Sequence, residues 1–350
     1  MSRKYKGFST PISDGSPIII IIIIINKKFK YLNVANLSVM ENGGQKEGGG
    51  GFQEDKDICK LKRYKLFLKF GAKPVNVAYP LPLASFLAFS LSNSGILEFL
   101  LSYIFCFFFF TAANLWNHLN DAEDDARDGR KHATFLINRR KEATIFSILF
   151  YFLSASILLF SKDSISIPLF LICALLTWIY SDKQFFGKKF KRLKEDYRTE
   201  LLTYLIVTPS FPALLWTFFA PFSTTALVFS LIFASLYLSG VLLKDLKDIT
   251  SDAIAGYKTL AIVLSPRTLF KISASVLVSV ILLVPILSFL SLLPTRSMFT
   301  AFILIPVLYS IFSIKKRNWE LSVETFNAIR IYALSYPITF ALLSILSLKF

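Results

Sequence analysis

Long apolar runs separated by short charged segments dominate the chain from about residue 57 onward. A helix of about 20 residues crosses a hydrocarbon layer of about 30 Å, and most of these runs approach that length. The first and the eighth runs are near the short end for a full span. The pattern predicts an all-α membrane protein with about nine transmembrane helices. We expect these helices at residues 75–92, 95–119, 142–161, 165–181, 200–219, 223–243, 268–291, 298–314 and 328–348.

The composition agrees with this class, because 54% of the residues are hydrophobic and 36 are Phe. The formal net charge of +16 could suggest a nucleic-acid partner. The basic residues are instead divided among the short segments between apolar runs, which is how membrane topology is encoded. We therefore expect membrane lipid as a partner and no nucleic acid. The three cysteines, Cys59, Cys106 and Cys173, form no CxxC pattern and indicate neither a disulfide framework nor a zinc site.

Alternate loops differ sharply in positive charge, which predicts the orientation of the protein in a cell membrane. Seven Lys and Arg residues lie in 56–73, six follow the second expected helix and seven follow the fourth. The other loops carry almost none. With an odd number of helices, the amino terminus is expected in the cytoplasm and the carboxyl terminus outside.

The first part of the chain differs from the rest. Residues 1–54 are rich in Ser, Gly and Asn, and we expect a disordered or weakly structured extension. The run of eight isoleucines from Ile18 to Ile25 would span only about 12 Å as a helix, too little to cross a bilayer. Whether this extension belongs to the expressed protein is open. Residues 55–350 are predicted to form the membrane domain, and it opens with a basic amphipathic segment, 57–73, suited to a membrane surface.

Two acidic clusters follow the second and the sixth expected helices, both on the cytoplasmic side. In the first, four Asp side chains project from one side of a helix and repel one another. A bound hard cation would explain this crowding. Two facing clusters suit a diphosphate clamped by two or more Mg²⁺ ions. The placement also suggests two related four-helix halves followed by a last helix. The clusters contain Asp121, Asp124, Asp125 and Asp128, and then Lys244, Asp245, Asp248 and Asp252.

A basic loop after the fourth expected helix is the second candidate feature. It contains Lys183, Lys188, Lys189, Lys191, Arg192 and Lys194. Such a loop is typical of a positive-inside signal, and it could also contact phosphate directly. His118 and His132 are the two histidines, and for His118 a structural hydrogen bond is favoured over catalysis.

The acidic clusters resemble the two motifs of the UbiA-type intramembrane prenyltransferases. Asn120-Asp121-x-x-Asp124-x-x-x-Asp128 matches the first motif. Asp245-x-x-Asp248-x-x-x-Asp252, followed by Gly256 and Thr259-Leu260-Ala261, resembles the second. The family's Tyr-Ser with following basic residues maps onto Tyr180, Ser181 and Arg192-Leu193-Lys194, and its Arg-Pro onto Lys73-Pro74 with Asn76 just after.

This resemblance implies a helical bundle around a central cavity that opens sideways to lipid, with Mg²⁺ and a polyprenyl diphosphate at its cytoplasmic mouth. It implies metal-assisted ionisation of the allylic diphosphate and attack by a hydrophobic or amphipathic acceptor. The catalytic and metal-binding candidates are Asp121, Asp124, Asp128, Asp245, Asp248 and Asp252. The substrate-binding candidates are Asn120, Lys73, Asn76, Tyr180, Ser181, Lys188, Arg192, Lys194 and Lys244.

The acceptor stays open at this point. An aromatic quinone precursor ranks first, followed by glycerophosphate ether lipids and carotenoid ends. Two other classes remain as alternatives, a CDP-alcohol phosphotransferase and a cation-coupled transporter. Gly129-Arg130-Lys131-His132 stands where related enzymes often carry an Asn-Arg-Pro-like segment, which weakens any choice of acceptor. Chain length of the donor, oligomeric state and a general base are not indicated.

Overall fold

The computed structural model describes residues 60–72, 81–92, 94–127, 133–247, 249–320 and 322–348. The described part is helical and contains no strand, only an isolated bridge between Asp196 and Lys258. The main helices of the bundle are α4 (Leu81–Leu91), α5 (Ile96–Arg127), α7 (Arg140–Ile157), α8 (Ser166–Ser181), α9 (Tyr197–Trp216), α10 (Thr224–Val241), α13 (Pro266–Phe289), α14 (Leu304–Lys316) and α15 (Phe326–Leu346). The shorter elements are α2 (Lys60–Gly71), α6 (Ala133–Asn138), α11 (Ile249–Ile254), α12 (Leu260–Val263) and the 3₁₀ turns η1 (Leu158–Phe160), η2 (Phe186–Lys188), η3 (Leu193–Glu195), η4 (Lys244–Lys247), η5 (Thr295–Ile303) and η6 (Val323–Thr325).

Each of the nine expected segments contains one of the helices α4, α5, α7, α8, α9, α10, α13, α14 and α15, so the predicted all-α bundle is confirmed. Seven helical segments of the described chain are long and apolar enough to cross a membrane, and the expected count of nine spans is not confirmed. The two others are α4, of which the structure describes the 11 residues Leu81–Leu91, and α9, whose Glu200, Tyr204 and Thr208 face a cavity. The expected eighth segment begins as the 3₁₀ turn η5 before it continues as α14.

The contacts between the helices form a closed ring. Consecutive helices pack on one another from α8 through α9, α10, α13 and α14 to α15. Helix α15 also packs on α4, and α5 packs on both α4 and α8. The order fits the predicted halves, α4–α8 and α9–α14, with α15 last. In each half the first helix packs on the second and the second on the third.

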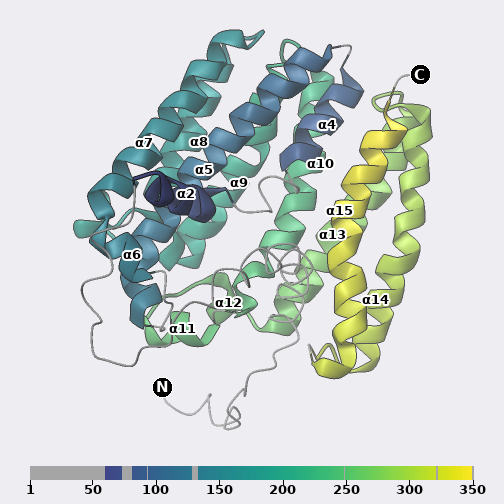
Figure 1. Cartoon of the computed structure of the whole chain (residues 1–350). Helices are drawn as coiled ribbons and strands as arrows, with labels where there is room; N and C mark the ends of the chain where they lie inside the picture. The colour runs from purple at the N-terminus through teal and green to yellow at the C-terminus, as the bar shows by residue number, and fades with distance from the viewer. Residues whose placement is uncertain are drawn as a thin grey trace, which may run out of the picture.

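Helix α2 covers the outside of the first half and crosses α5 and α7 in Figure 1. Its Phe67 is fully buried against Phe135 and Phe146, with ring centroids 5.5 and 5.7 Å apart. Arg63 forms an ion pair of 3.1 Å with Glu142 of α7. Lys62, Lys65 and Lys69 of α2 are exposed, so the helix has the apolar and basic faces that its sequence predicts. The expected extension 1–54 lies outside the described residues.

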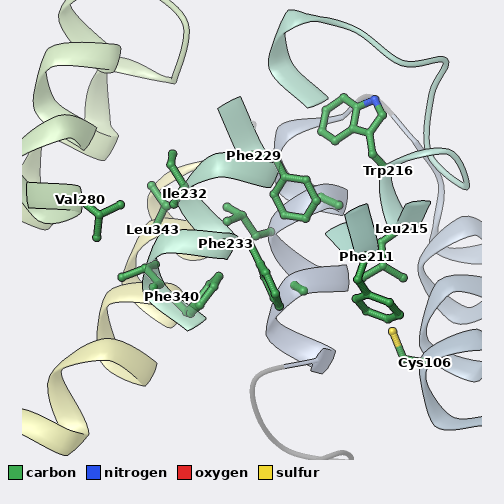
Figure 2. Packing of buried hydrophobic residues seen from close by; sticks show 14 of the residues in the cluster. Cys106, Phe211, Leu215, Trp216, Phe229, Ile232, Phe233, Val280, Phe340 and Leu343 are labelled. Carbon is green, nitrogen blue, oxygen red and sulfur yellow. The ribbon is translucent and has the colours of Figure 1, made fainter. Parts of the chain in front are cut away.

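The core is aromatic and reaches across the ring. Figure 2 shows Phe211, Leu215 and Trp216 of α9 beside Phe229 and Phe233 of α10, with further contacts to helices α13 and α15. Many large apolar side chains also point outward, which is expected of a surface that faces lipid. The packed interior fixes the positions of α5, α8, α9 and α10, the four helices that carry the candidate site.

Candidate active site

The central cavity has a volume of about 580 Å³ and lies between α5, α8, α9 and α10. On α5 the lining side chains recur at helical spacing, from Phe110 through Asn114 and Asn117 to Asp121 and Asp124. The cavity is therefore apolar at one end and charged at the other. At 1.5 Å per residue, Asp121 lies about 37 Å along α5 from its start, which is longer than a hydrocarbon layer of about 30 Å. The charged end is thus positioned to lie at a membrane face.

Three cations of the α8–α9 loop face the first acidic motif. Lys194 Nζ donates to both carboxylate oxygens of Asp121 at 2.6 Å, and Arg192 Nη1 donates to Asp121 Oδ1 at 2.6 Å. Lys183 Nζ donates to Asp124 Oδ2 at 2.6 Å. Acidic groups near the carboxyl end of a helix oppose its dipole. These cations offset that cost as well as the repulsion between the two carboxylates.

Arg192 is the centre of this charged network, and its side chain is only 1% exposed. Besides Asp121, it reaches Asp124 at 3.4 Å, Glu195 at 2.5 Å and the hydroxyl of Tyr257 at 2.6 Å. Burial alone would lower the pKa of Arg192, but the Asp121 carboxylate and Glu195 outweigh it and raise the pKa above its ordinary value. The guanidinium therefore stays charged although it is buried.

Lys194 behaves differently. Burial lowers its pKa below the ordinary value for lysine, and the Asp121 carboxylate offsets only part of this effect. Arg192 lowers the pKa of Lys194 further. The pKa of Lys194 is therefore lowered, whereas the pKa of the neighbouring Arg192 is raised.

Two asparagines of α5 fix the loop that carries these cations. Asn120 Oδ1 accepts from the backbone N–H of Lys183 at 2.8 Å, and its Nδ2 donates to the carbonyl of Trp116 at 2.8 Å. Asn117 Oδ1 accepts from Ser181 Oγ at 2.6 Å and from Lys194 Nζ at 3.0 Å. Asn120 is buried and does not line the cavity, so its contacts shape the loop, whereas Asn117 does line the cavity.

A second polar network surrounds Tyr180 at the end of α8. The buried Glu200 of α9 accepts from the hydroxyls of Tyr180 and Tyr204 at 3.2 and 3.0 Å through Oε1. Lys244 Nζ donates to the hydroxyl of Tyr180 at 3.0 Å and lies 3.7 Å from Glu200 Oε1. Its ammonium also lies 5.5 and 5.0 Å from the centroids of the Tyr180 and Tyr204 rings. The network holds Lys244 at the cavity wall.

The second acidic motif meets the same cavity. Asp252 of α11 lines it and accepts from Thr259 Oγ1 at 3.2 Å. The backbone of Asp245 belongs to η4, while its side chain and the whole of Asp248 lie outside the described structure. Tyr257, just after α11, donates to Asp124 Oδ2 at 3.0 Å and so ties the second motif to the first. Burial raises the pKa of the Tyr257 phenol above its ordinary value, which keeps it a donor.

The structure brings together most of the predicted residues that it describes. Asp121, Asp124, Tyr180, Ser181, Lys194, Lys244 and Asp252 all line the cavity, and Arg192 lies directly behind its wall. Lys188 does not belong to this group, because it is exposed on η2 beside a separate shallow depression. Asp128, Lys73 and Asn76 lie outside the described residues.

Five residues of the networks were not predicted from the sequence as site residues: Asn117, Glu195, Glu200, Tyr204 and Tyr257. Lys183 was expected only as a member of the basic loop. Glu200 and Tyr204 are four residues apart on α9, one turn of helix, and an acidic residue in an apolar run is a usable signal. The sequence gives no comparable signal for Tyr257. His118 lies 4.0 Å from the buried Asp125, which agrees with a structural role for this histidine.

The number and type of donor atoms around the cavity show whether the carboxylates fit a Mg²⁺ ion. Among the described residues, no three His, Cys, Asp or Glu side chains are close enough to hold one metal ion. Asp121, Asp124 and Asp252 nevertheless present oxygen donors to one cavity. Mg²⁺ commonly takes one or two carboxylates and completes its shell with water and substrate phosphate. The residues therefore fit a Mg²⁺ ion that binds together with a phosphorylated substrate.

Fold and site together define a multi-pass membrane protein with a cavity that joins a charged mouth to an aromatic interior. The chain belongs to the UbiA prenyltransferase family, whose sequence model matches residues 78–336. This confirms the resemblance seen in the sequence motifs, and it makes the protein a transferase of prenyl groups.

Individual relatives agree with the family. An uncharacterised protein of Archaeoglobus fulgidus is 47% identical over 271 residues, which are 77% of this chain and 94% of the relative. A solved digeranylgeranylglyceryl phosphate synthase shares the fold with a TM-score of 0.56 at 18% identity, over 80% of this chain and 98% of that chain. A solved UbiA homologue from Archaeoglobus fulgidus, bound to DMAPP and Mg²⁺, has a TM-score of 0.53 at 18% identity, over 80% of this chain and 99% of that chain.

Proposed function

We propose that this prenyltransferase takes its prenyl group from a polyprenyl diphosphate with the help of Mg²⁺ and transfers it to an aromatic acceptor of the quinone-precursor kind. One observation carries the proposal. A single cavity has carboxylates and Lys or Arg side chains at one end and Phe and Tyr side chains at the other. This arrangement matches a donor with a charged head and a hydrocarbon tail.

The head of the donor would lie between the two acidic motifs. Asp121, Asp124 and Asp252 would hold Mg²⁺. The ion would neutralise the charge of the diphosphate and stabilise the negative charge that develops on the departing diphosphate. Lys194 and Lys244 reach the same part of the cavity and would donate to the phosphate oxygens. A UbiA homologue of the same fold binds DMAPP together with Mg²⁺.

The walls beyond the mouth would protect the reactive carbon. The carbon–oxygen bond breaks and diphosphate leaves with the electron pair, so an allylic cation remains. Phe110, Phe233 and Tyr237 line the adjoining cavity, where they would exclude water and face the cation with their rings. The acceptor carbon then forms the new bond and releases its proton.

The acidic mouth is proposed to face the cytoplasm. The loops at this end carry Arg139, Arg140, Lys183 and further lysines. A surplus of Lys and Arg in short loops is typical of the cytoplasmic side. The carboxyl terminus would then lie outside.

The family assignment decides against the CDP-alcohol phosphotransferase and transporter hypotheses. Glycerophosphate ether lipids and carotenoid ends remain competing acceptors for the same chemistry. The aromatic side chains that line the cavity, among them Phe110, Tyr204 and Tyr237, favour an acceptor with an aromatic ring that packs against them. The aromatic acceptor therefore stays first.

The test uses purified protein in proteoliposomes with radiolabelled prenyl diphosphates and three acceptors: a hydroxylated aromatic acid, a prenylglyceryl phosphate and a carotenoid. We expect Mg²⁺-dependent transfer to the aromatic compound. Asp121→Asn and Asp252→Asn should abolish it while leaving the protein folded. Glu123→Gln is the matched control, because Glu123 lies on the same helix but forms a surface ion pair with Arg140. Full activity of Asp121→Asn, or transfer to another acceptor alone, would contradict the proposal.

A further inference from the structure

The basic loop between α8 and α9, residues 182–196, contains six Lys and Arg side chains that fall into two sets. Three of them face the cavity and pair with the first acidic motif, as described above. The other three are exposed, and no carboxylate in the described part of the chain lies within ion-pair distance of them: Lys188, Lys189 and Lys191. The acidic mouth therefore accounts for only half of the positive charge of this loop.

Three aromatic rings lie among the exposed lysines. Phe185, Phe186 and Phe190 expose 56%, 53% and 69% of their surface. The loop lines a shallow depression with side chains of both kinds: Gln184, Phe185, Phe186, Lys188, Lys189 and Phe190. An exposed apolar patch with a polar rim is typical of a surface that binds a partner or a membrane. We therefore expect a ligand that has an apolar part and an anionic part.

The turn that presents these side chains is fixed by its own backbone. Asp182 is buried, and its carboxylate accepts from the backbone N–H of Phe186 at 2.6 Å. The backbone N–H groups of Lys189 and Phe190 both donate to the carbonyl of Phe186 at 3.0 Å. Gly187 lies so close to the backbone of Asp182 that no side chain would fit there. The depression is therefore a formed feature of the loop.

The contact of this loop with α5 indicates its depth in the membrane. The ring of Phe185 lies beside the rings of Trp116 and Trp178, with centroids 6.2 Å away in both cases. At 1.5 Å per residue, Trp116 lies about 30 Å along α5 from Ile96, which equals the thickness of a hydrocarbon layer. Phe185 is thus level with the boundary between acyl chains and headgroups. Segments with Phe and Lys side chains bind membranes at this depth.

We infer that segment 185–191 binds an anionic phospholipid of the bilayer in which the protein lies. The phenylalanine rings contact the glycerol backbone and the first carbons of the acyl chains, and the lysines bind the phosphate group. A free phosphate ion would satisfy the lysines but leave the rings in water, and an uncharged lipid would satisfy only the rings. This binding site is separate from the proposed reaction, because none of its residues lines the central cavity.

The experiment measures which lipid touches the loop. A fluorescent nitrobenzoxadiazole label is attached to Phe190→Cys in a Cys59→Ser background, because Cys106 and Cys173 are buried. The labelled protein is placed in phosphatidylcholine nanodiscs that contain, at equal mole fraction, either phosphatidylglycerol or phosphatidylcholine with a nitroxide on its acyl chain. The nitroxide quenches the label only at close range. The ratio of the two quenching efficiencies therefore reports the local preference for the anionic lipid.

Two pairs of substitutions separate a local site from the general charge of the protein. Lys188→Gln with Lys189→Gln removes two charges from the depression. Lys315→Gln with Lys316→Gln is the matched control, because these lysines are also exposed and end α14, on the opposite side of the bundle from α8 in Figure 1. Both pairs remove the same net charge, so a difference between them is a local effect.

With all lysines present, we expect nitroxide-labelled phosphatidylglycerol to quench about fivefold more strongly than phosphatidylcholine, roughly the factor that one lysine contributes near an anionic surface. This preference should vanish in the Lys188→Gln and Lys189→Gln protein and persist in the control pair. Weak quenching by both lipids would mean that a soluble protein or a second copy of the chain covers the loop, and it would overturn the inference. Equal quenching by both lipids, or an equal loss of preference in both pairs, would overturn it as well.

Discussion

The buried Arg192 offers the sharpest test of how the acidic mouth is held together. Its guanidinium contacts Asp121, Asp124, Glu195 and Tyr257 from a side chain that is 1% exposed. Arg192→Leu removes the charge and every one of these hydrogen bonds while keeping an apolar stem of similar reach. The carboxylates of Asp121, Asp124 and Glu195 therefore lose one of the positive charges that balance them.

The expected cost follows from the partners that remain. Deleting one member of a buried ion pair costs about 3–5 kcal/mol, because the other charge stays buried and unpaired. Lys194 still holds Asp121 and Lys183 still holds Asp124, which places the loss near the lower limit, about 3 kcal/mol. Arg192→Lys keeps the charge but loses the planar fork, so it should cost about 1–2 kcal/mol.

The assay is reversible unfolding in mixed micelles by titration with SDS, followed by tryptophan fluorescence. Trp116 and Trp178 stack at 3.8 Å beside the site and report on it directly. A double-mutant cycle with Asp121→Asn should show a coupling of about 1 kcal/mol or more, because the two groups touch. Arg198→Leu is the control: Arg198 is exposed on the neighbouring turn and should change stability by about 0.5 kcal/mol or less. The reasoning is refuted if Arg192→Leu unfolds like Arg198→Leu, or if the cycle is additive.

Two further predictions concern packing and charge. An added Cβ at Gly71 would lie 2.5 Å from the backbone oxygen of Thr111, so Gly71→Ala should loosen α2 from α5 and lower the melting temperature. Gly240→Ala, where the same atom meets side chains at 3.4 Å and longer, should be neutral or stabilising; equal effects of the two changes would refute this. Lys194→Met should raise the affinity for Mg²⁺ without substrate by about fivefold, since a unit charge at 4 Å is worth about 1 kcal/mol even in water. It should also weaken diphosphate binding; Mn²⁺ binding followed by electron paramagnetic resonance checks the first effect, and unchanged metal affinity contradicts it.

The helical architecture could be predicted because membrane insertion imposes it. Long apolar runs with charged loops allow few structures besides a helical bundle, since every backbone group must be satisfied internally. The sequence also predicts the helix at 200–219 that becomes α9, but hydropathy does not mark α9 as a span, and its Glu200, Tyr204 and Thr208 face the cavity. Hydropathy measures exposure to lipid, so it undervalues a helix that turns a polar face inward.

The sequence predicts the site residues that belong to a spaced acidic motif. It predicts less well the residues that reach the site only through the folding of a loop. Asp121, Asp124 and Asp252 follow from spacing alone, and the structure places them on one cavity. Lys188 and Arg192 belong to the same basic loop, yet one is exposed and the other is buried. Asp182 causes part of this difference, because its carboxylate accepts from the backbone N–H groups of Gln184, Phe185 and Phe186 and turns the chain. Such a turn decides which basic residue of the loop faces the site. The composition of the loop does not reveal where the turn lies.

The contacts of the basic loop also change the meaning of the first acidic motif. The crowding of its carboxylates alone suggested that a metal ion must neutralise them. Lys183, Arg192 and Lys194 already do so, and a metal ion that bound alone would have to compete with them. A diphosphate brings negative charge that these cations can take up, which frees the carboxylates for Mg²⁺. Metal and donor should therefore bind cooperatively, and neither the acidic motif nor the basic loop can be understood as a site without the other.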